Sequence, residues 1–237
     1  MKSLNDPVSA GRRDIEPSQS LPASLLRLEG DSDRCLLITS ARRGEGKSFV
    51  TTGLGWVLSD ELIAANSSKR VLLIDANLRS PTLHQMCSMQ NRRGLADVLA
   101  ETLDPVEAIQ HVNDGLSLLP AGGFGGVRLR RPRLEKMQQV LGALLPLFER
   151  IIVDAPAVLE YRDALTMAPF ADAVLLVVQA GETSVADLRD ARAVLEKAGG
   201  RVAGVIMNGG STAASPMAGR GTPAAALLET LSGRTGA

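Results

Sequence analysis

The chain has 237 residues, of which 45% are apolar, and this is enough to bury one full α/β core. Its 26 basic residues balance 26 acidic ones, so no overall field favours nucleic acid or anionic lipid as a partner. No run of 18 apolar residues occurs and residues 1–30 lack the hydrophobic core of a signal peptide, so we expect a cytoplasmic protein that binds no nucleic acid.

A glycine loop near the start of the chain is the strongest motif. Residues 1–30, rich in proline, serine and charge, predict a flexible N-terminal arm. The apolar run Leu36–Ile38 then predicts a short buried strand, and residues 49–62 have apolar side chains at helical spacing. Between them lies a loop that contains Gly44 and Gly46 and ends in Lys47-Ser48. Strand, glycine loop and helix in this order are the context of a phosphate-binding loop (P-loop).

The chemistry of such a loop identifies the expected ligands. Its backbone N–H groups turn inward and bind an anion at the start of the helix. Lys47 would supply a charge to the β- and γ-phosphates, and the Ser48 hydroxyl would bind Mg²⁺. The first glycine of G-x-x-x-x-G-K-[ST] is here Ala41, and the alternative is a chance Gly-Lys-Ser in a turn. The expected ligand is ATP with Mg²⁺, and the candidate binding residues in the loop are Arg42, Arg43, Gly44, Glu45, Gly46, Lys47, Ser48 and Phe49.

The remainder of the chain alternates between apolar strands and helical patterns. Thr183 is the expected N-cap of a helix that runs to about residue 198. Residues 210–237, rich in Gly, Ala, Ser and Thr, predict a low-complexity tail. Continuous apolar strands between helices indicate a doubly wound, mostly parallel sheet with helices on both faces, the α/β fold of P-loop NTPases. The expected strands after the first are 71–75, 116–120, 150–154, 173–178 and 202–207, and a further helix is expected over 134–148.

Two strands end on an aspartate. Asp75 follows the apolar run 71–74, and Asp154 follows Ile-Ile-Val. Both would lie beside the P-loop at the carboxyl edge of a parallel sheet. Asp154 fits a carboxylate that holds Mg²⁺ directly or through water, and Asp75 is a candidate second metal contact or general base. The alternative for each is an aspartate that caps a helix or a turn.

Three segments carry a family resemblance. Ala41-Arg-Arg-Gly-Glu-Gly-Lys-Ser48, Val71-Leu-Leu-Ile-Asp-Ala-Asn-Leu-Arg-Ser-Pro81 and Ile151-Ile-Val-Asp-Ala-Pro156 resemble the Walker A, Walker A′ and Walker B segments of the bacterial tyrosine kinases of capsule and exopolysaccharide synthesis. The likeness covers about residues 35–208.

The resemblance implies that residues 31–209 form an ATP-binding kinase-like domain that transfers the γ-phosphate to tyrosine. Lys47, Asp75 and Asp154 would be catalytic, Ser48 and the two aspartates would hold the metal, and Asn208 would contact the adenine. A membrane-embedded chain-length regulator would be the partner that recruits the protein to the inner face of the membrane.

Three departures from the family pattern separate the alternatives. Asn77 stands where the family has a second carboxylate, and an amide can neither accept a proton nor neutralise Mg²⁺. The ring-building pattern E-x-x-R-x-x-R is reduced to Arg27 within residues 19–28. The tail has no tyrosine, and Tyr161 is the one tyrosine of the chain. A regulatory ATPase without kinase activity is therefore the alternative, and we expect a monomer or small homo-oligomer whose phosphorylated tyrosines, if any, belong to other proteins.

Two groups of arginines remain. Arg42 occupies the place of the signature lysine of positioning and partition ATPases, and we interpret it as a solvated side chain, which disfavours that class. Residues 128–133 contain four arginines with no stacking platform beside them except Phe124. A solvated or partner-facing loop is favoured there over a nucleic-acid or lipid patch.

Overall fold

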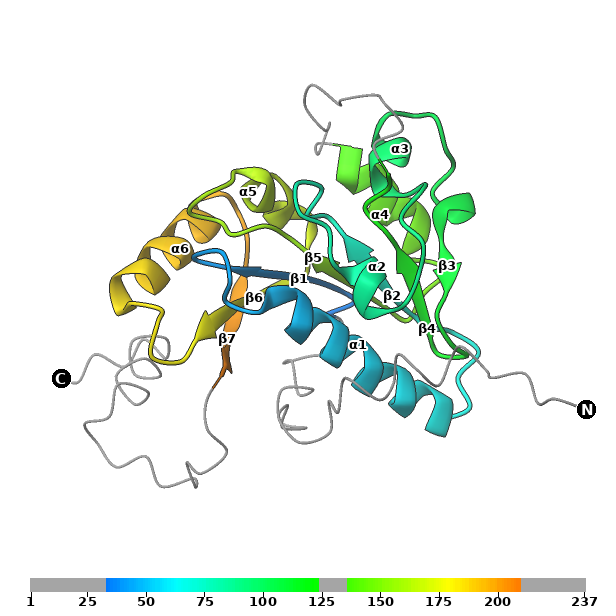
Figure 1. Ribbon diagram of the computed structural model, residues 1–237, viewed down its shortest axis with the longest axis horizontal. Coiled ribbons are helices and arrows are strands. Elements are labelled where there is room, and N and C mark those ends of the chain that lie inside the picture. Colours follow the sequence, from blue (N-terminus) through cyan, green and yellow to red (C-terminus); the bar gives the residue numbers. More distant parts are fainter. Residues whose placement is uncertain (1–32, 124–135, 210–237) are drawn as a thin grey trace, which may run out of the picture.

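The computed structural model describes residues 33–123 and 136–209. The predicted N-terminal arm, the arginine-rich segment 128–133 and the predicted tail lie outside these ranges. The described residues contain one seven-stranded sheet with the order β3-β4-β2-β5-β1-β6-β7. All neighbouring strands are parallel except the pair β3 and β4 (Figure 1). The predicted mostly parallel sheet is thus confirmed.

The strands follow the apolar runs of the sequence closely. Five of them are buried along almost their whole length, because a parallel sheet covered on both faces leaves no strand side for water. The half-exposed β7 lies at one edge of the sheet. The strands are β1 (Cys35–Ser40), β2 (Val71–Asp75), β3 (Gln110–His111), β4 (Leu116–Leu119), β5 (Arg150–Asp154), β6 (Ala173–Gln179) and β7 (Val202–Asn208).

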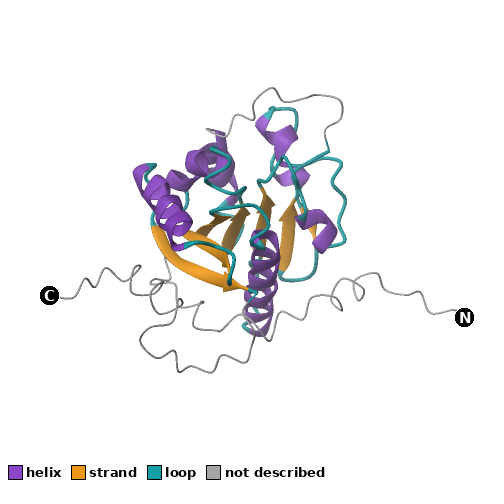
Figure 2. Ribbon diagram, turned by 60° about the vertical axis from the view of Figure 1, so that its left-hand side comes forward, coloured by secondary structure: helices purple, strands orange, loops and turns teal. Residues whose placement is uncertain are grey.

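Helices cover both faces of this sheet, as predicted. Leu36 and Ile38 of β1 pack on the side of α1, whereas Leu37 packs into the larger core that includes residues of α4 and α6. The alternation follows from the two-residue period of a strand. Figure 2 shows the strands as one layer with the longest helix across it. The helices are α1 (Lys47–Ala64), α2 (Leu83–Met86), α3 (Leu95–Leu99), α4 (Met137–Leu144), α5 (Asp163–Met167) and α6 (Val185–Lys197), with 3-10 turns η4 (Val106–Ala108) and η6 (Ala168–Phe170).

Two details differ from the expectations. The N-cap of α6 is Ser184 and not Thr183: the Ser184 hydroxyl accepts a hydrogen bond from the Asp187 N–H at 3.0 Å. Thr183 instead turns its hydroxyl toward the backbone N–H of Gln179, at 2.8 Å. Strand β3 was not predicted, because its two residues have no periodicity and are fixed by their pairing with β4.

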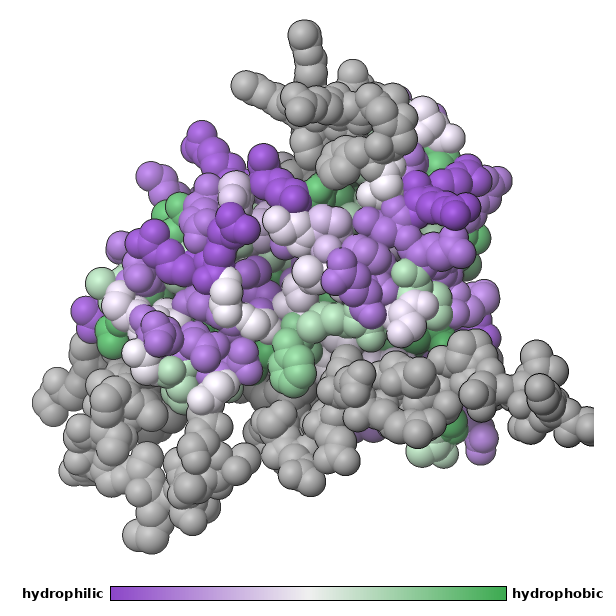
Figure 3. All heavy atoms as spheres, in the orientation of Figure 1, coloured by the Kyte–Doolittle hydropathy of each residue, from purple (hydrophilic) through white to green (hydrophobic). Residues whose placement is uncertain are grey.

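The described residues on one face of the molecule are mainly polar. Figure 3 shows hydrophilic residues over most of the face seen in Figure 1, with a small hydrophobic group near its middle. Among the described helices, none is long and apolar enough to cross a bilayer.

Candidate nucleotide and metal site

The loop between β1 and α1 has the backbone shape that its glycines predict. Gly44 and Gly46 both have φ of 84°, in the left-handed region that disfavours a side chain. Gly46 is also the N-cap of α1, so the helix starts at Lys47. A Cβ on Gly46 would lie 1.9 Å from Asn208 Nδ2, which leaves no room for any other residue. The loop therefore presents its backbone N–H groups at the start of a helix of 18 residues, where an anion binds.

Glu45 anchors the loop from within. Its side chain is buried, with 4% of its surface exposed. One carboxylate oxygen accepts a hydrogen bond from the Arg42 N–H at 2.7 Å, and the other accepts one from the Thr183 hydroxyl. The Glu45 carbonyl in turn accepts a hydrogen bond from Asn208 Nδ2 at 3.2 Å. Glu45 and Asn208, both predicted to bind nucleotide, thus have described partners that hold the loop to β7 and to the turn before α6.

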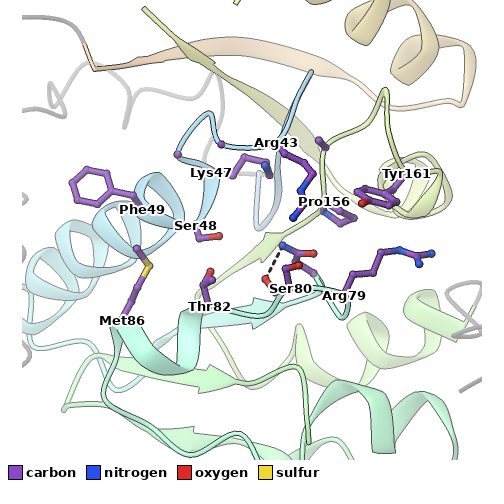
Figure 4. A pocket seen from close by; sticks show the side chains of 14 residues that line it. Arg43, Lys47, Ser48, Phe49, Arg79, Ser80, Thr82, Met86, Pro156 and Tyr161 are labelled. Atoms are coloured by element: carbon purple, nitrogen blue, oxygen red, sulfur yellow. Dashed lines mark hydrogen bonds between the residues drawn. The ribbon is translucent and has the colours of Figure 1, made fainter. Parts of the chain in front are cut away.

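A pocket of about 330 Å³ lies beside this loop (Figure 4), within the size range of small-molecule sites. Its walls come from the P-loop, from the segment after β2 and from the segment after β5. Among the described residues that line it, three are cations and none has a carboxylate. Such a pocket suits a polyanion. The lining residues are Arg43, Gly44, Gly46, Lys47, Ser48, Phe49, Asn77, Arg79, Ser80, Thr82, Met86, Pro156, Ala157 and Tyr161.

Lys47 is the buried cation of the pocket, with 8% of its surface exposed. Burial lowers its pKa, and the nearby carboxylate of Asp154 opposes that change. The interior thus destabilises this charge while no ligand is bound. A phosphate group in the pocket would offset that cost, so the predicted role of Lys47 agrees with its surroundings.

Asp154 lies at the end of β5 and is completely buried; like Asp75 it does not line the pocket, but it bonds to Ser48, which does. Its Oδ2 accepts a hydrogen bond from the Ser48 hydroxyl at 2.6 Å. Its buried Oδ1 has no hydrogen bond of good geometry among the described residues, although the equally buried Thr51 hydroxyl lies close enough to lower the pKa of this carboxyl slightly. Burial and the charge of Asp75 raise the pKa of this carboxyl to about 7. A cation at this point would give Oδ1 a strong partner and keep the carboxylate ionised.

Mg²⁺ fits this donor set. It is usually held by one or two protein groups, together with substrate phosphates and water. Within residues 33–123 and 136–209, no group of three or more His, Cys, Asp or Glu side chains could hold a metal ion.

Asp75 has a different environment from Asp154. Its oxygens accept three backbone hydrogen bonds, from Asn77 at 3.2 Å, Thr82 at 3.0 Å and Leu83 at 3.1 Å. Burial raises its pKa to about 6 in spite of these bonds. The carboxylate does not line the pocket. It shapes the segment after β2, which does line it.

That segment and the one after β5 supply pocket residues that were not predicted. Arg79 lies over the ring of Tyr161, at 4.9 Å from its centroid, and its Nε is 3.3 Å from Asp163 Oδ2. Figure 4 shows Arg79 and Tyr161 together on the wall opposite Phe49 and Met86. The sequence contained all of these residues, but nothing in it pairs position 79 with position 161.

The two arginines of the loop differ. Arg43 lines the pocket, whereas the side chain of Arg42 points to α6 and contacts Asp187 Oδ1 at 2.8 Å. The Arg42 side chain is 55% exposed, ion-paired and not among the residues that line this pocket, so its predicted role in nucleotide binding stays a prediction. Asn77 lines the pocket and donates a hydrogen bond from Nδ2 to the Ser80 carbonyl at 3.0 Å, drawn as the dashed line in Figure 4.

The sequence matches one protein-family profile and is similar to several known proteins. The family profile described as "Cellulose biosynthesis protein BcsQ" matches residues 34–198. The tyrosine-protein kinase YwqD of Bacillus subtilis is 30% identical over 177 residues, which are 74% of this chain and 72% of YwqD. The succinoglycan biosynthesis transport protein ExoP of Rhizobium meliloti is 34% identical over 185 residues, 76% of this chain but only 23% of ExoP. The chain thus spans about a quarter of that longer relative.

Solved structures give the same result. The kinase domain of the Escherichia coli tyrosine kinase Etk superposes with a TM-score of 0.69 and 28% identity, over 84% of this chain and 76% of that domain. The septum site-determining protein MinD of Pyrococcus horikoshii, complexed with Mg-ADP, has a TM-score of 0.62 and 25% identity, over 73% of this chain and 68% of MinD. The chain therefore belongs to the BcsQ-like family of P-loop proteins and, with YwqD and Etk, to the bacterial tyrosine-kinase group.

Proposed function

We propose that this chain binds Mg-ATP and acts as a protein-tyrosine kinase in exopolysaccharide or capsule synthesis. The observation that carries the proposal is the fully buried carboxylate of Asp154, bonded to the Ser48 hydroxyl at 2.6 Å, where Ser48 lines a pocket with three cations and no carboxylate among its described lining residues. A phosphate chain with its metal would satisfy both the carboxylate and the cations. The names of the relatives YwqD and ExoP supply the reaction and the polysaccharide context.

The residues would divide the work as follows. Lys47 and the loop N–H groups would bind the phosphates, and Ser48 and Asp154 would hold Mg²⁺. When bound, the metal would neutralise charge on the phosphates. Asp75 would position the segment that bears Asn77 and Arg79; to serve also as a metal contact or general base, it would have to release backbone hydrogen bonds. Asn208, through its hydrogen bond to the Glu45 carbonyl, would support the loop, and it would also contact the adenine.

We also propose a place of action. ExoP is named a transport protein and is about four times longer than its matching segment. We therefore propose that this chain works in the cytoplasm, at the inner face of the membrane, beside a membrane-embedded chain-length regulator. Exposed arginines and the pocket mouth would be available to protein substrates there.

One observation favours a second candidate, a regulatory ATPase that signals through its nucleotide state. Asn77 lines the pocket with its amide committed to the Ser80 carbonyl, so this wall has no carboxylate for a metal or a proton. A tyrosine hydroxyl, with a pKa near 10, needs help to become a nucleophile. If neither Asp75 nor Asp154 gives that help, ATP is bound and hydrolysed without transfer to tyrosine.

A transfer assay separates the two. The purified protein is incubated with labelled ATP, Mg²⁺ and a random copolymer of glutamate and tyrosine, with Lys47→Ala as the control. Phosphotyrosine on the copolymer, absent with the variant, supports the kinase. Labelled inorganic phosphate without phosphotyrosine supports the regulatory ATPase. Calorimetry that detects no ATP binding to the parent protein would rule out both.

A further inference from the structure

Arg43 is an uncommitted cation of the pocket. Its backbone N–H donates a hydrogen bond to Glu160 Oε1 at 2.8 Å, so its main chain is fixed against the segment after β5. In the described part of the chain, no hydrogen bond or ion pair engages its guanidinium. Figure 4 shows this side chain extending into the pocket toward Pro156. By contrast, the neighbouring Arg42 is paired with Asp187, and Arg79 with Asp163.

The pocket therefore holds two converging charges from one loop. The charge of Arg43 contributes to lowering the pKa of Lys47, so the two cations are within electrostatic reach of each other. Their mutual repulsion is unfavourable in the empty pocket. A bound polyanion would outweigh this repulsion, because each cation would then be attracted to negative oxygens.

The position of Arg43 indicates which phosphate of a bound nucleotide it would contact. Lys47 and Ser48 start helix α1, so the phosphate that sits on the helix N-terminus lies beside them. The pocket continues from there to Pro156, Arg79 and Tyr161, and Arg43 extends over this continuation. A phosphate chain that starts at Lys47 and runs into the continuation places its last phosphate next to Arg43.

We propose that Arg43 binds the terminal phosphate of ATP and makes this site prefer a nucleoside triphosphate to a diphosphate. The inference rests on the proposed function, because it requires that the pocket binds a nucleotide. A guanidinium suits this task, since its planar fork can donate two parallel hydrogen bonds to one phosphate. Among the described residues that line the pocket, none is acidic. The Glu160 carboxylate accepts from the Arg43 backbone N–H and not from its guanidinium, so the fork is left for a phosphate.

Calorimetry with two nucleotides tests the proposal. Affinities for Mg-ADP and for the non-hydrolysable β,γ-methylene analogue of ATP are measured with the parent protein, Arg43→Gln, Arg43→Lys and Arg162→Gln. Arg162→Gln is the matched control, because it removes one charge from an exposed arginine near the pocket that does not line it. Melting temperatures of the nucleotide-free variants show whether each is folded.

We expect Arg43→Gln to weaken binding of the ATP analogue about tenfold or more, as for a lost charge-assisted hydrogen bond, and to leave ADP affinity within about twofold. Arg43→Lys should restore part of the loss, and Arg162→Gln should change neither affinity. An equal loss for both nucleotides, or no loss, would overturn the proposal while the parent's own nucleotide binding still supports the proposed function. A parent protein that binds neither nucleotide overturns both.

Discussion

Asp75 and Asp154 are register partners on the neighbouring strands β2 and β5, and both are completely buried. Asp75 is compensated by three backbone N–H groups, whereas Asp154 has one well-formed hydrogen bond, from Ser48, and only a weak contribution from the nearby Thr51 hydroxyl. Burial raises the pKa of both carboxyls, and the neighbouring charge of Asp75 raises the pKa of Asp154 further. The nucleotide-free site is therefore destabilised by its own charges, which a bound metal ion would relieve.

This relationship predicts a pH dependence of stability. The folded-state pKa of Asp154, about 7, lies above its ordinary value of 3.8, so the folded protein binds the proton more tightly than the unfolded chain does. This contribution to stability is complete at low pH and is lost as the pH rises from about 4 to about 7. Asp154→Asn should therefore raise the free energy of unfolding of the nucleotide-free protein by about 1 kcal/mol or more at pH 8, with little effect at pH 4.

Urea unfolding at several pH values measures the effect, with the exposed Asp114→Asn as a control that should show no such pH trend. The same Asp154→Asn variant should lose Mg²⁺-dependent ATP binding. A variant less stable than the parent at pH 8 would contradict this account of the buried carboxylates.

Lys47→Ala should abolish binding of both ATP and ADP while the fold remains. The side chain is buried, and its charge is already disfavoured by desolvation, so its removal costs the empty protein little. Calorimetry measures binding and circular dichroism measures the melting temperature, which should not fall. Lys69→Ala is the control, because Lys69 is an exposed lysine that does not line the pocket. Unchanged ATP affinity in Lys47→Ala would refute the central role of this loop.

The anchor of the P-loop can be tested at Thr183. Thr183→Val removes the hydroxyl that donates to the buried Glu45 and accepts from the Gln179 N–H. It should lower the free energy of unfolding by about 1–3 kcal/mol, because buried polar groups lose a partner. It should also weaken ATP and ADP binding by the same factor, since the loop backbone itself changes. Thr183→Ser, which keeps the hydroxyl, should restore both properties; failure to do so would assign the effect to packing.

Asn77→Asp should raise the rate of ATP hydrolysis or of phosphoryl transfer. The side chain lines the pocket, so the variant adds a carboxylate where the described wall has none. Asn77→Ala separates the added charge from the lost hydrogen bond to Ser80, and it should not raise turnover. Equal turnover of the aspartate variant and the parent at saturating Mg²⁺ would mean that a second carboxylate is dispensable in this protein.

The sequence predicted those features that depend on local pattern. The strand over 150–154 was predicted with its observed bounds, because a buried parallel strand is a continuous apolar run that ends at a polar residue. The glycine loop was predicted because left-handed backbone requires glycine at Gly44 and Gly46.

Features that depend on tertiary contacts were not predicted. The pairing of Arg79 with Tyr161, and the three backbone bonds that occupy Asp75, follow from which segments meet at the sheet edge. Thr183 was predicted to be a helix cap because threonine is common there. Its actual partner, Glu45, is 138 positions away, and no local sequence pattern indicates such a bond.

Tyr161 provides the last prediction, because it is the one tyrosine of the chain and lines the pocket. Its contact with Arg79 is weak, about 1 kcal/mol for an exposed cation–π pair. Its backbone is held more firmly: the Tyr161 N–H donates to the Ala157 carbonyl at 3.0 Å, and the Val158 N–H donates to Ser40, at the start of the P-loop, at 2.8 Å. We therefore expect Tyr161 to remain a fixed wall of the pocket and not to move in line with a terminal phosphate.

The expected result is that the isolated protein, a monomer or small oligomer on a sizing column, has no phosphate on Tyr161 when mass spectrometry is applied after expression with ATP available. Tyr161→Phe keeps the ring and should leave phosphorylation of the glutamate–tyrosine copolymer unchanged. Tyr161→Ala removes the ring that Arg79 covers and should alter it. Abundant phosphate on Tyr161 that disappears in Lys47→Ala would contradict the expectation, since the wall residue would then itself be the acceptor.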